Sequence, residues 1–112
     1  MIFRIIAIVL VVCCWGCQPT QATTLDSNAS PGAKIFQVQC AGCHLGGGNI
    51  IRRGKNLKQR ALQQNGYDSV EAIAEIVTYG KNNMSAFGDR LTTDEIEMVS
   101  TYVLEQAEAN WR

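Results

Sequence analysis

Two cysteines and a histidine share one short run, Cys40-Ala41-Gly42-Cys43-His44. Two thiols three residues apart on a helical turn project to one side, where each can add to a vinyl group of a haem. A histidine directly after the second cysteine lies beneath the iron and can bind it. The run therefore predicts one covalent haem c, attached through Cys40 and Cys43, with His44 as an axial iron ligand.

Other sites use the same cysteine spacing. A redox-active dithiol needs no adjacent histidine and normally sits in an alternating strand-helix pattern, which this sequence lacks. A zinc site needs further ligands, and no cysteine or histidine follows His44. The earlier pair, Cys14 and Cys17, is followed by Gln18 and lies in an apolar segment, so we assign it no haem.

Haem iron bound by one histidine has either a second axial ligand or an open position for small molecules. A second protein ligand would be a methionine, because His44 is the only histidine. Met1 belongs to an export segment, and Met98 falls within a predicted helix, where a methionine usually packs. Met84 follows forty residues after His44 in a glycine-bounded loop, and we favour it as the ligand. A thioether ligand raises the potential and closes the haem to small molecules, which leaves electron transfer.

The elements that position these residues form one small domain. Residues 1–22 resemble a signal peptide, with Arg4 before an apolar core that is too short to span a membrane as a mature helix. A rival interpretation is lipidation at Cys17. Residues 23–30 are expected to be a flexible lead-in, and residues 31–112 form the domain. With a formal charge of −1 over residues 23–112, the mature chain has no basic field for nucleic acid.

The predicted fold class is all-α, with four to five helices around the haem. No segment shows a convincing strand period. We expect a first helix from Ser30-Pro31 to the cysteines, a short one over 57–64, one between Ser69 and Gly80, and a last one that opens at 92–95. Ile96, Val99, Val103 and Ala107 are the expected buried stripe of the last helix.

A basic run, Arg52 to Lys58, holds four of the nine basic residues of the mature chain. Such a run is usually a solvated surface. The alternative is a role in partner docking or in binding the haem propionates.

From Pro31 to Arg112 the chain closely resembles the cytochrome c6 family of cyanobacteria and algae. The matching residues are Gly32-x-x-x-Phe36, the haem motif, Gly46 to Asn49, Asn56-Leu57-Lys58, Glu71-Ala72-Ile73, Gly80-Lys81-Asn82, Met84-x-Ala86-Phe87, Arg90-Leu91, Tyr102-Val103 and Trp111.

This resemblance implies a fold in which the first and last helices cross, with Phe36 near Tyr102. It implies a lumenal, or periplasmic, monomeric carrier between the cytochrome b6f complex and photosystem I, with Arg90 helping the docking. Two residues depart from the family pattern: Ser85 replaces a proline after Met84, and Ile76 replaces a glutamine near the haem. An aliphatic residue at position 76 is similar to the pattern of divergent family members, which have a lower redox potential.

Two other functions are compatible with the sequence. The carrier could deliver electrons to a terminal oxidase or another periplasmic acceptor. Transfer to any of these acceptors needs only an exposed haem edge on the carrier and a surface for transient binding. A haem-based ligand sensor would require Met84 to swing away from the iron. No acid-base residue for a distal pocket is evident, so we do not expect an enzyme.

Overall fold

The computed structural model describes residues 27–112. The expected signal peptide, the lipidation alternative at Cys17 and the start of the lead-in lie outside the described residues and stay predictions. The helices are α1 (Pro31–Gln39), α2 (Ala41–His44), α3 (Gln59–Asn65), α4 (Val70–Tyr79) and α5 (Thr93–Glu108), with single-turn 3-10 helices η1 (Leu45–Gly47) and η2 (Arg53–Lys55).

The predicted all-α class is confirmed. Within residues 27–112 the extended pairing is limited to an isolated bridge between Lys81 and Met84. No helix of this part of the chain is long and apolar enough to cross a bilayer.

Polar side chains start three of the helices where the sequence predicts. Ser30 Oγ accepts the amide of Ala33, and Ser69 Oγ accepts that of Ala72. Thr92 and Glu95 bond reciprocally in a capping box at the start of α5. Gly66 and Gly80 end α3 and α4 at φ angles of 75° and 69°, which favour glycine.

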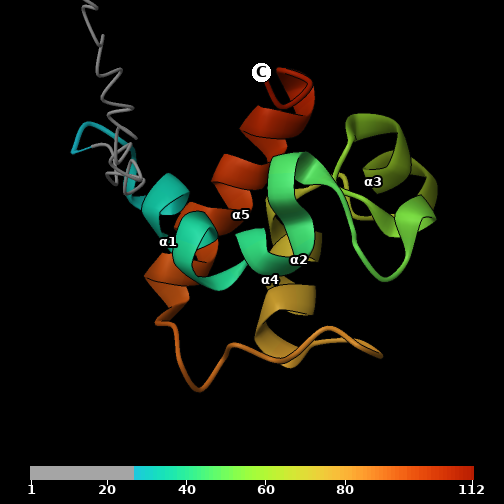
Figure 1. The fold of residues 1–112 in the computed structure, drawn as a ribbon. Helices are drawn as coiled ribbons and strands as arrows, with labels where there is room; N and C mark the ends of the chain where they lie inside the picture. Colours follow the sequence, from blue (N-terminus) through green and yellow to red (C-terminus); the bar gives the residue numbers. More distant parts are fainter. Residues whose placement is uncertain (1–26) are drawn as a thin grey trace, which may run out of the picture.

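The core forms where α5 crosses α1 and α4 (Figure 1). Phe36 lies with its ring centroid 5.4 Å from that of Tyr102 and 5.1 Å from that of Trp111. The contact between Phe36 and Tyr102 implied by the resemblance is thus confirmed. The buried apolar residues are Phe36, Ala41, Ala61, Leu62, Ile73, Val77, Ile96, Val99, Val103 and Ala107.

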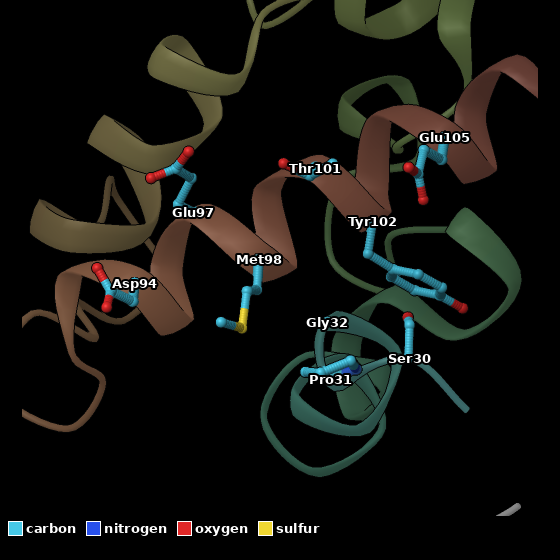
Figure 2. Close-up of a pocket in the computed structure, with 9 residues that line it drawn as sticks. All are labelled: Ser30, Pro31, Gly32, Asp94, Glu97, Met98, Thr101, Tyr102 and Glu105. Atoms are coloured by element: carbon cyan, nitrogen blue, oxygen red, sulfur yellow. The ribbon is translucent and has the colours of Figure 1, made fainter. Parts of the chain in front are cut away.

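Gly32 permits the close crossing of α1 and α5. A Cβ at this position would overlap the carbonyl oxygen of Met98 and lie 2.9 Å from Cβ of Tyr102. Beside the crossing runs an open groove, with Ser30 and Pro31 on one wall and the α5 residues from Asp94 to Glu105 on the other (Figure 2). The side chain of Met98 borders this groove and is 44% exposed.

Candidate haem-binding site

The two cysteines lie at the junction of α1 and α2. Cys40 is both the C-cap of α1 and the N-cap of α2. Its carbonyl accepts the amides of Cys43 at 3.1 Å and His44 at 2.9 Å. This turn sets the two thiols and the imidazole in one fixed relation. Both cysteines are free thiols, so neither is committed to a disulfide. Cys43 is exposed, whereas burial raises the pKa of the Cys40 thiol to about 11.

The imidazole of His44 is held by a backbone carbonyl. Its Nδ1 lies 2.8 Å from the carbonyl oxygen of Gly48. A carbonyl can only accept, so Nδ1 carries a proton, and in the neutral imidazole the free lone pair is then on Nε2. A metal-binding histidine normally donates its other ring N–H to such an acceptor, which fixes its tautomer and orientation. This contact orients the half-buried ring so that Nε2 could bind an iron ion.

The turn that supplies this carbonyl is braced from the far end of the chain. Gly46 and Gly47 both have positive φ angles, of 59° and 76°. The indole of Trp111 fills the space where a Cβ of Gly47 would stand, and its Nε1 donates to the carbonyl of Leu57 at 3.0 Å. Gly47 accepts the amide of Leu57 at 2.7 Å. The C-terminal tryptophan thus fixes the position of the loop that orients His44.

The loop that carries Met84 is also held by its backbone. Lys81 and Met84 exchange two backbone hydrogen bonds, of 3.1 and 2.9 Å. The loop then returns to α4, where Phe87 and Gly88 donate to the carbonyls of Val77 and Thr78. Met84 is half-buried and packs against the core. These bonds hold the loop without the proline that Ser85 replaces.

A second contact reaches this loop from the turn after α3. Lys81 Nζ donates to the hydroxyl of Tyr67 at 3.2 Å and lies 5.8 Å from the centre of its ring. Tyr67 is itself fixed, because its amide donates to Leu62 at the end of α3 and its ring packs on the core. Tyr67 thus connects α3 to the Met84 loop.

The remaining candidates occupy distinct places. Met98 borders the groove between α1 and α5, whereas Met84 packs on the core in the loop after α4. Arg90 is exposed; its Nη2 donates to Ala86 O at 3.0 Å, and its guanidinium lies 4.5 Å from the ring centre of Phe87. Ile76 is half-buried in α4, and its carbonyl accepts the amide of Gly80 at 2.8 Å.

Three residues that position the candidate site were not predicted from the sequence. The glycine run before Asn49 signalled a turn, but not that Gly48 would accept from His44. Trp111 matched the family pattern with no contact attached to it. No sequence signal pointed to Tyr67, because its partner Lys81 lies fourteen residues further along the chain.

The residues fit a covalent haem c. Two free thiols three residues apart can provide the attachment points, and the imidazole of His44 can provide an axial ligand. Of the two described methionines, Met84 is the one in the loop anchored to α4. Among residues 27–112 no group of three or more histidine, cysteine or acidic side chains could hold a bare metal ion. The donor set therefore suits a haem and does not suit a zinc site.

Comparison with protein families agrees with this chemistry. Residues 27–103 match the family model described as cytochrome c oxidase, cbb3-type, subunit III. A cytochrome c6-like protein of Nostoc sp. is 61% identical over 85 residues, covering 76% of this chain and 77% of that protein. Cytochrome c6 of Parathermosynechococcus lividus is 50% identical, covering 76% of this chain and 98% of that protein.

Solved structures give the same result. Cytochrome c6C of Synechococcus sp. PCC 7002 is 64% identical with a TM-score of 0.70, covering 71% of this chain and 98% of that chain. Cytochrome c6 of the diatom Phaeodactylum tricornutum is 47% identical with a TM-score of 0.71, covering 72% of this chain and 95% of that chain. Both the standard and the variant forms thus match the described domain.

Proposed function

Because the chain belongs to the cytochrome c6 family, we propose that it carries single electrons from the cytochrome b6f complex to photosystem I in the thylakoid lumen. Whatever its partners, the chain is an electron-transfer protein with one covalent haem c, and not an enzyme. Delivery to the lumen would require the expected signal peptide over residues 1–22.

One contact carries the haem-binding part of the proposal, the hydrogen bond between Nδ1 of His44 and the carbonyl of Gly48. When bound, the haem supplies an iron that alternates between the ferrous and ferric states. Cys40 and Cys43 would fix its position, and His44 would bind one face through Nε2. Met84 would close the other face, because its loop is anchored to the end of α4. With both faces closed, a carrier transfers electrons without ligand chemistry.

The experiment is a spectroelectrochemical titration of the haem-loaded protein. The proposal predicts a reversible one-electron transition with a potential high enough to accept electrons from the cytochrome b6f complex. A clearly lower potential would favour the divergent members and another acceptor. Carbon monoxide added to the ferrous protein at neutral pH should leave the spectrum unchanged. A changed spectrum would support the ligand sensor instead.

A second candidate function has the same single-electron transfer but a different electron acceptor. The match to the cbb3-type oxidase subunit model supports a periplasmic carrier that delivers electrons to a terminal oxidase. Oxidation of the reduced protein by membranes that contain the oxidase but no photosystem I would favour this candidate. Illuminated photosystem I should oxidise it faster if the first proposal holds.

A further inference from the structure

The described part of the chain separates its charges by position. Residues 27–67 contain no aspartate or glutamate, whereas nine acidic residues follow from Asp68 onward. Five cations lie within nine residues of the first part, and all five are exposed: Arg52, Arg53, Lys55, Lys58 and Arg60. We call residues 50–60 the basic lobe. In Figure 1 it is the green segment that leads into α3 and includes the first two residues of that helix.

The positive charge of the basic lobe is not neutralised within the described residues. The one ion pair of residues 27–112 joins Arg90 to Asp89, and no carboxylate pairs with a lobe cation. Five unpaired cations on one short segment create a local positive potential, although the formal charge of residues 23–112 is −1.

Three asparagines hold the basic lobe in one shape. Asn49 Oδ1 accepts the amides of Ile51 and Arg52, and its Nδ2 donates to the carbonyl of Lys55. Asn56 bonds the backbone on both of its sides, with Arg53 O at 2.7 Å and Lys58 N at 3.0 Å.

Asn65, at the end of α3, completes the brace. It accepts from Lys55 Nζ and donates to Gly54 O. The lobe therefore presents its cations from a fixed backbone, and a partner need not order it on binding.

The basic lobe is continuous with the haem site. The amide of Ile50 donates to the carbonyl of Cys43 at 3.1 Å, and Gly48, two residues earlier, orients His44. The side chains of Ile50 and Ile51 are 70% and 55% exposed at the start of the lobe. A small apolar contact beside a charged surface suits a brief encounter in which charge steers the approach.

We propose that the basic lobe is the docking surface for an acidic protein partner that exchanges electrons with the haem. This inference rests on the proposed carrier function and specifies the partner's surface: carboxylates around a small apolar contact. A protein fits better than a membrane, because two isoleucines are too little apolar surface to anchor in lipid. The lobe would raise the association rate more than the final affinity.

The test uses small redox reagents in place of the unidentified partner. Stopped-flow spectroscopy follows oxidation of the ferrous haem-loaded protein by the trianion ferricyanide, which gains one electron to become ferrocyanide while no proton moves. The variant Arg52→Gln, Arg53→Gln removes two positive charges from the lobe. Lys34→Glu in α1 changes the net charge by the same amount elsewhere, so it is the matched control.

At low ionic strength the lobe variant should react with ferricyanide about three- to tenfold more slowly than wild type, and the difference should shrink as salt is added. Cationic tris(phenanthroline)cobalt(III) should react faster with the same variant. Lys34→Glu should move both rates by less than a factor of about two. Equal effects of the lobe variant and the control would overturn the inference, because net charge alone would then explain them.

Two other results separate this inference from the proposed function. If neither reagent oxidises the ferrous protein, the carrier function fails and the docking inference falls with it. If the lobe variant keeps wild-type rates but no longer binds vesicles of anionic phospholipid that wild type binds, the carrier function stands. The lobe would then contact a membrane, and the protein-docking inference would be wrong.

Discussion

Replacing Gly32 by alanine tests whether the crossing of α1 and α5 is as close as the structure has it. In an exposed helix the change would stabilise the protein by about 0.8–1.0 kcal/mol through helix propensity. Here the added methyl group would overlap the carbonyl of Met98 and lie 2.9 Å from Cβ of Tyr102. Overpacking of this kind costs about 1–3 kcal/mol, and the obstacle is backbone, which cannot rotate away.

The clash spreads to neighbouring contacts, because α1 must move away from α5. Phe36 would then lose contact with Tyr102 and Trp111, and each aromatic pair contributes about 0.5–1.5 kcal/mol. After subtraction of the propensity gain, we expect a net loss of about 3 kcal/mol. For a domain of this size that lowers the melting temperature by about 12–24 °C.

The assay is urea and thermal unfolding of the haem-loaded protein, followed by circular dichroism. Gly54→Ala is the matched control, because a Cβ at Gly54 meets no atom within 4 Å and its φ angle is ordinary. The control should be neutral or slightly stabilising. Gly32→Ala with stability equal to or above wild type would refute the close crossing.

Three further changes test the contacts around the site. Tyr67→Phe removes the hydroxyl that accepts from Lys81, so the Met84 loop should open more readily. Imidazole should then bind the ferric protein about fivefold more tightly, a change of about 1 kcal/mol. Tyr79→Phe, at an exposed position, should not change the imidazole affinity, and equal effects of the two variants would show that the contact with Lys81 does not hold the loop. Trp111→Phe leaves the carbonyl of Leu57 without its donor and should lower the free energy of unfolding by about 1–3 kcal/mol, measured in urea; an unchanged midpoint would show that water replaces the indole. Ile76→Gln should raise the midpoint potential, and an unchanged potential would remove the reason for singling out this residue.

Local sequence signals predicted the elements well, because each helix start depends on residues within one turn. Ser30, Ser69 and Thr92 cap the helices as expected, and the predicted stripe of α5 is buried. The short helix expected over 57–64 begins two residues later, at Gln59. No side-chain cap fixes its start, so composition alone could not place it.

Contacts between distant residues could not be predicted in the same way. The cysteine motif predicted the candidate site, because haem attachment depends on spacing along a single turn. The bond from Trp111 to Leu57 joins residues 54 positions apart, and it depends on how α5 lies across the core. The bond from Lys81 to Tyr67 likewise depends on the path of two loops. Such contacts follow from packing, which no local pattern records.

We infer that His44 and Met84 close both faces of the haem. One-dimensional proton NMR of the ferrous haem-loaded protein tests it most directly, because the ring current of the porphyrin shifts the methyl group of an axial methionine far upfield. We predict that this resonance is present in wild type and in Met98→Ala and absent in Met84→Ala. A resonance that survives in Met84→Ala, or none in wild type, would contradict ligation of the iron by Met84.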